Sequence, residues 1–247
     1  MRARTSGVNT TSVKYKCDKC SDTTWIYGEN GYIRCECFEI DLANRLWENF
    51  GIKPEDAKML RDYDVYSKET QLAKEKAIDY IKSFDEIKDT RENSFCLRGQ
   101  PGAGKTHIVV AIGKALINKR IPVVYMPYLE VLRQLKAGTM DEEYYNNLIN
   151  KYKRARVLII DDLFKDKVKK RKLIGELKES DIRHICPILN YRYLNKMPTL
   201  ISTECTPEML LDLDEALGGR ILEMSGKRFG LTFGEESNYR LRKFLEE

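Results

Sequence analysis

A glycine-rich segment at residues 99–106 constrains the fold of this chain more than any other part of the sequence. It reads Gly-Gln-Pro-Gly-Ala-Gly-Lys-Thr, it follows a β-prone run, and it opens a helical stretch over residues 107–118. A strand, a loop with this spacing of glycines before Lys-Thr, and a helix together form a phosphate-binding loop. The sequence therefore predicts an α/β nucleotide-binding domain built around this loop.

The side chains of the loop predict how a nucleoside triphosphate is held. Glycine lets main-chain N–H groups surround the β-phosphate at the start of the helix, Lys105 neutralises the β- and γ-phosphate oxygens, and the Thr106 hydroxyl reaches Mg²⁺. We expect Lys105 to be essential for catalysis as well as for binding. The residues expected to bind ATP are Gly99, Gln100, Pro101, Gly102, Ala103, Gly104, Lys105, Thr106 and His107.

A second motif lies downstream, where the apolar run at residues 157–160 ends in Asp161 and Asp162. The carboxyl ends of parallel strands meet at the edge of the sheet where nucleotides bind. We therefore expect Asp161 to hold Mg²⁺ through water, and Asp162 to orient or deprotonate the attacking water.

Strand-like and helix-like runs alternate from residue 94 onward, which is the pattern of a parallel sheet with helical crossovers. The predicted fold class is α/β, a five-stranded parallel sheet flanked by helices and preceded by a small N-terminal module. A helix at residues 68–84 and a polar loop at 85–93 lead into the sheet. The strands are expected at residues 94–98, 122–126, 156–160, 199–203 and 228–233.

Four cysteines near the N-terminus have the spacing of metal ligands. Cys17 and Cys20 precede a predicted hairpin with strands at 23–27 and 32–35, and Cys35 and Cys37 close it. Thiolates at the two ends of one hairpin suit tetrahedral Zn²⁺. An iron–sulfur cluster and free thiols stay open as alternatives, because the second pair is closer in sequence than the usual Cys-x-x-Cys.

The length of 247 residues fits one α/β domain with a small additional module. We expect a basic tail and zinc hairpin at residues 1–40, a helical linker at 41–68 and the ATPase domain at 69–247. No apolar run approaches the roughly 18 residues that cross a bilayer. The cysteines total seven, an odd number that fits a reducing compartment better than a disulfide framework. These features predict a soluble, cytoplasmic protein without a membrane partner.

The formal net charge of +5 is concentrated in residues 165–178, a segment that contains seven basic and two acidic residues. A local basic patch indicates contact with nucleic acid more strongly than a modest overall charge does. A run of charges is also the usual composition of a solvated loop, so both interpretations stay open.

Together these motifs resemble those of bacterial and phage helicase loaders of the DnaC/DnaI type, AAA+ ATPases of the IstB-like ATP-binding superfamily. The resemblance covers nearly the whole chain. It is carried by the cysteine hairpin with Thr-Thr-Trp-Ile inside it, GQPGAGKTH, IIDDLF, ILNYRYLNKMPTLISTE and ALGGRILEM. It implies an N-terminal module that binds the hexameric replicative DNA helicase, and ATP-dependent homo-oligomers whose cores touch single-stranded DNA.

The resemblance also implies roles for residues beyond the phosphate loop. In AAA+ proteins a polar residue after the fourth strand senses the γ-phosphate; here the usual Asn is absent and Thr203 or Glu204 takes its place. The ALGGRILEM segment offers Arg220 as the arginine that reaches a neighbouring subunit's nucleotide. Arg240 is a candidate sensor that acts within its own subunit.

Two other functions share part of this pattern. A transposition-targeting ATPase has the same core but acts on duplex DNA, and the cysteine hairpin favours the loader over it. A small-molecule kinase with a phosphate loop needs an acceptor pocket and a mobile lid. Arg220 and the cysteine module instead indicate an oligomeric protein that acts on a partner protein.

Overall fold

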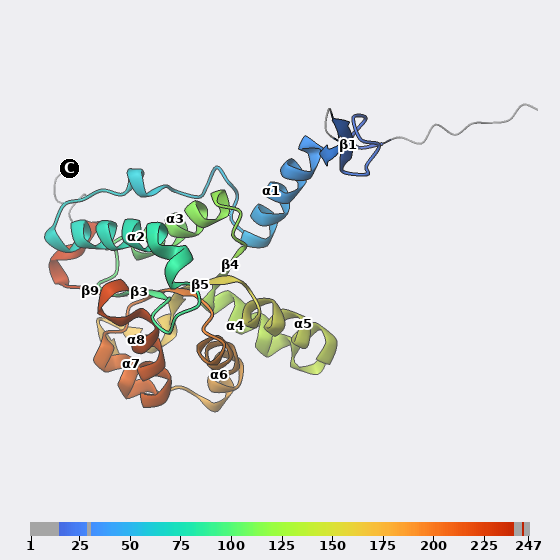
Figure 1. The fold of residues 1–247 in the computed structure, drawn as a ribbon. Coiled ribbons are helices and arrows are strands. Elements are labelled where there is room, and N and C mark those ends of the chain that lie inside the picture. Colours follow the sequence, from blue (N-terminus) through green and yellow to red (C-terminus); the bar gives the residue numbers. More distant parts are fainter. Residues whose placement is uncertain (1–14, 29–30, 240–243, 245–247) are drawn as a thin grey trace, which may run out of the picture. The chain divides into compact units, whose positions relative to one another are not determined.

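The computed structural model describes residues 15–28, 31–239 and 244, which form two compact units, Met1–Arg45 and Leu46–Glu247 (Figure 1). The predicted basic tail lies outside the described residues as far as residue 14. No helix of the described chain is long and apolar enough to cross a membrane.

The first unit contains the predicted hairpin. Its strands β1 (Trp25–Gly28) and β2 (Gly31–Arg34) pair antiparallel, with Trp25 opposite Arg34. Helix α1 (Glu36–Phe50) begins directly after the hairpin and continues into the second unit. Among the described residues of the first unit, only Cys20 and Cys35 are buried. This unit therefore has almost no apolar core.

A five-stranded sheet in which every pairing is parallel forms the centre of the second unit, as predicted. The strands follow the order β4-β5-β8-β3-β9 across the sheet, so the chain crosses over between elements that are not neighbours. Their bounds are β3 Phe95–Gly99, β4 Val123–Pro127, β5 Val157–Leu163, β8 Thr199–Thr203 and β9 Gly230–Phe233.

Helices cover both faces of this sheet (Figure 1). One face is covered by α2 and α3, and the other by α4, α6 and α8, with α5 and α7 packed outside them. The helix bounds are α2 Lys68–Ile87, α3 Lys105–Asn118, α4 Tyr128–Ala137, α5 Glu142–Lys153, α6 Glu179–Leu194, α7 Pro207–Leu213 and α8 Glu215–Phe229. Short 3-10 turns lie at Leu60–Asp62, Gly138–Met140, Lys165–Lys167 and Glu235–Ser237.

Strand β5 shows why the apolar runs of the sequence become central strands. Leu158 and Ile160 face the cluster formed with α4, α6 and α8, whereas Ile159 points to the other face and approaches Gly113 of α3. Successive side chains of a strand alternate between faces, so a strand covered on both sides must be apolar throughout. Polar residues become possible only where the strand reaches the edge of the sheet, at Asp161 and Asp162.

The basic segment at residues 165–178 contains a short ordered hairpin, β6 (Val168–Lys169) paired with β7 (Lys172–Leu173). Lys167 at its base is buried and contacts Asp166 and Asp181, while Lys136 contacts the other oxygen of Asp181. One of the seven basic residues of this segment is thus neutralised inside the protein rather than solvated.

Candidate nucleotide site and cysteine cluster

A cavity of about 570 Å³ opens at the carboxyl edge of the sheet in the second unit. Residues 101–107 of the phosphate loop and α3, together with Asp162 and Glu204, line one part of it. Ligand pockets commonly have this size and this position in open α/β sheets. The structure thus brings the loop and the strand-end carboxylate into one cavity.

The phosphate loop is built around glycines and a buried lysine. Gly99 (φ 89°) and Gly104 (φ 79°) have left-handed backbone angles that other residues rarely adopt, and a Cβ on Gly104 would meet the ring of Tyr63 at 2.6 Å. Lys105 is buried, and its ammonium donates to the carbonyls of Gly99 at 2.9 Å and Gln100 at 2.7 Å. A buried cation beside main-chain N–H groups at a helix N-terminus fits an anionic phosphate.

Asp161 is held by three hydroxyl groups from three different elements. Its Oδ1 accepts from Thr106 at 2.8 Å and from Ser202 at 2.5 Å, and its Oδ2 accepts from Tyr125 at 2.7 Å. Burial and the Asp161 carboxylate raise the pKa of Tyr125, so its hydroxyl stays protonated and donates. Carboxylate and hydroxyl oxygens are the ligands that Mg²⁺ prefers, so Asp161 and Thr106 fit this ion.

A β-bulge aims Asp162 into the cavity. The register of β5 against β8 shifts between Ile160 and Leu163, and Asp162 adopts a left-handed φ of 56° there. The Ser202 hydroxyl accepts a hydrogen bond from the Asp162 main-chain N–H at 2.9 Å, which holds the bulge. Bulges commonly redirect side chains at active sites, and this one separates the direction of Asp162 from that of Asp161.

The two candidates after β8 have different surroundings. Thr203 is buried, and its hydroxyl donates to the carbonyl of Leu163 at 2.7 Å. Glu204 lines the cavity and forms an ion pair with Lys165, which also lines it. Of the two candidates, Glu204 is therefore the one that lies at the cavity, together with Lys165 from the turn after β5.

A segment ahead of α2 also lines the cavity. The Tyr63 hydroxyl donates to the carbonyl of Ala103 at 2.8 Å, and the Met59 carbonyl lies 2.9 Å from Nε2 of His107. Tyr66 also lines the cavity. The sequence predicts a linker for this segment, and it does not predict the contacts that Ser202 and Tyr125 make with Asp161.

The two arginines are placed differently. Arg220 is not among the described residues that line the cavity. It lies in α8, where its Nη1 donates to Oδ1 of Asn190 at 2.5 Å. Arg240 lies outside the described residues.

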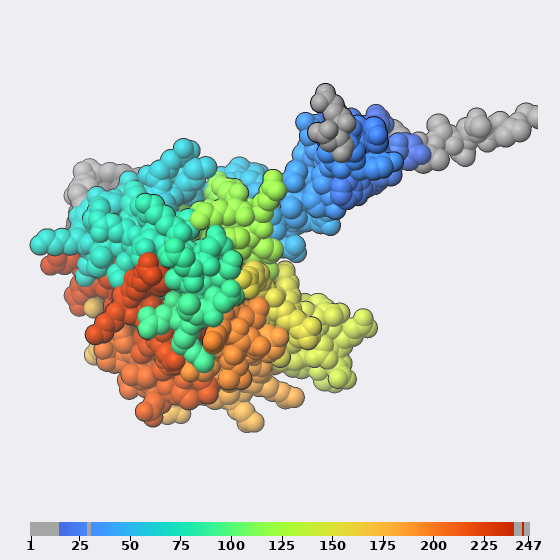
Figure 2. Space-filling model, in the orientation of Figure 1, coloured from blue at the N-terminus to red at the C-terminus, as the bar shows by residue number. Residues whose placement is uncertain are grey.

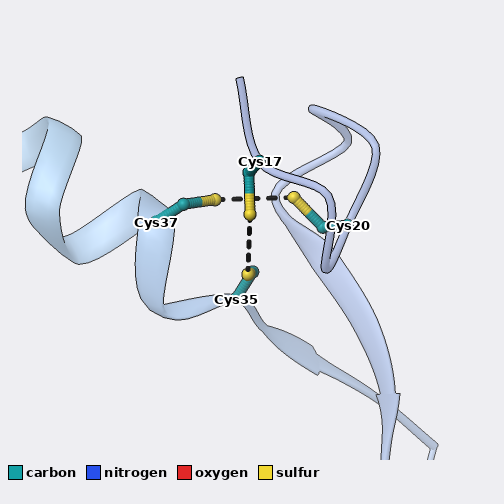
Figure 3. A group of neighbouring side chains, drawn as sticks. All are labelled: Cys17, Cys20, Cys35 and Cys37. Atoms are coloured by element: carbon teal, nitrogen blue, oxygen red, sulfur yellow. Dashed lines mark hydrogen bonds between the residues drawn. The ribbon is translucent and has the colours of Figure 1, made fainter. Parts of the chain in front are cut away.

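The four N-terminal cysteines converge in the first unit (Figure 3). All four sulfur atoms lie within 4.8 Å of one another, with 3.8 Å between Cys17 and Cys35 and 3.5 Å between Cys20 and Cys37. Tetrahedral Zn²⁺ with sulfur at about 2.3 Å separates its ligands by about 3.8 Å, so this arrangement fits the ion.

Comparison with known proteins identifies the family to which the chain belongs. The family model described as IstB-like ATP binding protein matches residues 50–174, half of the chain. The chain is an IstB-like ATP-binding protein. The matched range includes the phosphate loop, β5 and the segment that contains Tyr63.

Three relatives extend the match beyond this range. YqaM of Bacillus subtilis is 37% identical, over 91% of this IstB-like chain and 70% of the relative. XkdC of the phage-like element PBSX of Bacillus subtilis is 34% identical, over 92% and 87% of the two chains. The replicative helicase loader DnaC of Escherichia coli is 26% identical, over 79% and 76%.

The fold of this IstB-like protein agrees with solved structures. A crystal structure of the DnaC helicase loader matches with a TM-score of 0.59 and 22% identity, over 77% of this chain and 99% of that one. A crystal structure of DnaI matches with a TM-score of 0.56 and 18% identity, over 76% and 94%. The AAA+ fold predicted from the sequence is therefore confirmed.

Proposed function

We propose that this IstB-like protein is an ATPase that loads the replicative DNA helicase onto single-stranded DNA at the initiation of replication. The observation that carries the proposal is the likeness to the DnaC loader, which extends over three quarters of both chains. The likeness to YqaM and XkdC covers more of this chain, 91% and 92%, but their names specify no activity.

The site geometry supports ATP hydrolysis with divided roles. Lys105 binds the phosphates, Asp161 with Thr106 holds Mg²⁺, and Asp162 orients the attacking water. A carboxylate would repel a γ-phosphate, so we assign to Glu204 the task of holding the Lys165 ammonium at the cavity edge. When bound, Mg²⁺ neutralises charge on the transferring phosphoryl group.

Tyr63 and Tyr66, from the segment ahead of α2, add aromatic side chains to the lining of this site. Aromatic side chains stack on nucleobases, and an apolar wall with a few polar groups is the usual lining of a ligand pocket. We therefore include residues 46–68 in the ATP-binding unit, although the predicted domain boundary at residue 69 leaves them out.

We propose that the cysteine cluster holds one structural Zn²⁺ and that the first unit docks on the helicase. Because the buried residues among those described in this unit are themselves two of the ligands, Cys20 and Cys35, metal binding supplies most of its folding free energy. Its exposed Trp25, Tyr27 and Tyr32 provide an aromatic surface of the kind found at protein interfaces.

The zinc proposal predicts one Zn²⁺ per chain by metal analysis, and loss of the first unit's structure in a chelator. Cys37→Ser should lose the metal and helicase binding, whereas ATP binding by residues 46–247 should persist. Cys186→Ser is the matched control, because Cys186 lies in α6 of the second unit and is not one of the four clustered cysteines. Freshly purified protein without zinc would contradict the proposal.

We propose that the β6–β7 hairpin contacts the DNA backbone. Lys170 and Arg171 occupy its turn with φ of 49° and 61°, a conformation that costs roughly 1–2 kcal/mol for each residue other than glycine. Such strain is commonly found at functional sites. The ion pairs of buried Lys167 anchor the hairpin. Residues 169–172 are exposed, and Arg171 among them pairs with the exposed Glu235.

This proposal predicts a change in salt dependence. Changing Lys169, Lys170, Arg171 and Lys172 to Gln should weaken binding to single-stranded DNA and reduce the slope of log affinity against log salt by up to about 3, at about 0.7 per phosphate contact. Filter binding across a salt series measures the slope. Four exposed lysines elsewhere serve as the charge-matched control: Lys68, Lys82, Lys196 and Lys227. An unchanged slope in the hairpin variant would mean that the hairpin is only a solvated element.

A pull-down from the source cell tests the loader proposal against its main alternative. A tagged Asp162→Asn protein, which should retain ATP, is expected to recover a hexameric helicase identifiable by mass spectrometry. Recovery of a transposase instead would favour a transposition-targeting ATPase that acts on duplex DNA.

A further inference from the structure

Arg220 is held in the structure by neutral groups. Its Nη1 donates to the Asn190 amide oxygen at 2.5 Å, and its guanidinium carbon lies 5.4 Å from the ring centre of Tyr193. Asn190 and Tyr193 both belong to α6, so they fix the arginine of α8 from the neighbouring helix. These contacts restrict the guanidinium without neutralising its charge.

A carboxylate lies close by in sequence but is bound elsewhere. Glu223 is three residues beyond Arg220 in α8, a spacing at which opposite charges pair on a helix surface. Instead, its Oε2 accepts from the Tyr193 hydroxyl at 2.8 Å, and its Oε1 lies 3.6 Å from Nε of Arg91. Arg91 and Tyr193 thus take both oxygens of Glu223.

Arg91 is itself fixed against α6. Its Nη1 donates to the Tyr193 carbonyl at 2.8 Å, and its guanidinium carbon lies 4.4 Å from the centre of the Tyr193 ring. Figure 2 shows the segment between α2 and β3 against α6 and α8 on one face of the second unit. Three segments distant in sequence therefore meet around Tyr193.

The result is an arginine without a compensating charge. Within the described chain, no carboxylate lies within ion-pair distance (4.0 Å) of the Arg220 guanidinium. A phosphate oxygen is a stronger partner for guanidinium than an amide oxygen is, because both groups carry charge. Arg220 can therefore exchange Asn190 for a phosphate at little cost, which a carboxylate partner would prevent.

We propose that Asn190 and Tyr193 are positioning residues for Arg220, and that Arg91 together with Tyr193 holds Glu223 away from it. The inference rests on the proposed function, in which Arg220 acts on the nucleotide of a neighbouring subunit. These residues keep the Arg220 guanidinium in a fixed orientation and prevent a carboxylate from neutralising its charge before a phosphate binds.

Asn190→Asp tests the inference with a change of one atom group. A carboxylate at the position of the amide oxygen would bind Arg220 by a charge-assisted hydrogen bond worth about 1.5–3 kcal/mol. Turnover should fall about 10- to 100-fold with ATP affinity unchanged. Asn190→Ala removes the contact without trapping the arginine, so its loss of turnover should be smaller, about 2- to 5-fold.

A second pair of variants tests the role of Arg91. Arg91→Ala frees Glu223 to pair with Arg220 and should lower turnover about 3- to 10-fold, since exposed pairs on a helix are weaker. Adding Glu223→Gln should restore turnover, a rescue that general destabilisation cannot produce. Arg156→Ala is the control, because Arg156 also pairs with an exposed carboxylate, that of Asp89.

The outcomes separate this inference from the function on which it rests. If Arg220→Ala is inactive but Asn190→Asp turns over normally, the positioning role is wrong and the arginine finger stands. If Arg220→Ala itself turns over normally, the proposed role of Arg220 fails. A reduced ATP affinity of Asn190→Asp, or failure of Glu223→Gln to rescue Arg91→Ala, would also overturn the inference.

Discussion

Lys105→Ala is expected to abolish ATP binding. Lys105 is a buried cation that donates to two carbonyls of the loop, so its removal takes a positive charge away from the place where the phosphates are expected. Removing one member of a buried charge pair typically costs 2–5 kcal/mol or more, which corresponds to about 30-fold to several thousand-fold in affinity. Equilibrium binding of a fluorescent ATP analogue measures the loss.

Two variants frame this result. Lys119→Ala removes an exposed lysine at the far end of α3 and should bind ATP normally. Asp162→Asn should also bind ATP but hydrolyse it about 10²- to 10⁴-fold more slowly, the usual contribution of a general base. Native affinity of Lys105→Ala would show that the cavity is not a phosphate site.

Arg220→Ala should bind ATP normally and hydrolyse it about 10³- to 10⁵-fold more slowly, the effect of removing an arginine finger. Arg220 lies in α8 and is not among the described residues that line the cavity of its own chain, so the proposed role has it act on the nucleotide of a neighbouring subunit. Steady-state turnover together with ATP affinity separates this effect from that of Lys105→Ala.

Mixing the two inactive variants tests whether the site is shared. The Lys105→Ala subunit still presents Arg220, and the Arg220→Ala subunit still binds ATP. In a random head-to-tail assembly about one interface in four joins the intact loop to the intact arginine, so turnover should recover to about a quarter of the native value. An inactive mixture of co-assembled variants would mean that Arg220 does not act across an interface.

The sheet could be predicted because its signals are local. Each central strand is a short apolar run that ends in polar residues, and the β5 run 157–160 leads directly into Asp161 and Asp162. The strand itself extends to Leu163 through a bulge. The bulge could not be foreseen, because the hydroxyl that holds it belongs to Ser202 on another strand.

The missed parts of the site depend on contacts between residues far apart in sequence. Tyr63 lies 40 residues before its partner Ala103, and nothing in the sequence around it indicates a ligand. In the sequence Lys167 cannot be told apart from the solvated cations around it, whereas in the structure it forms an ion pair with Asp181. Ser202 had a usable signal: it is polar inside an apolar strand, and alternation places it on the opposite face from Thr203.

The most direct test of the loader account uses circular single-stranded DNA, which a closed helicase ring cannot enter by threading over an end. The partner helicase, native protein and ATP should give DNA-bound helicase that survives gel filtration, whereas Lys105→Ala should give none. Equal amounts of helicase on the circle with native protein, with Lys105→Ala and with no added protein would contradict the account.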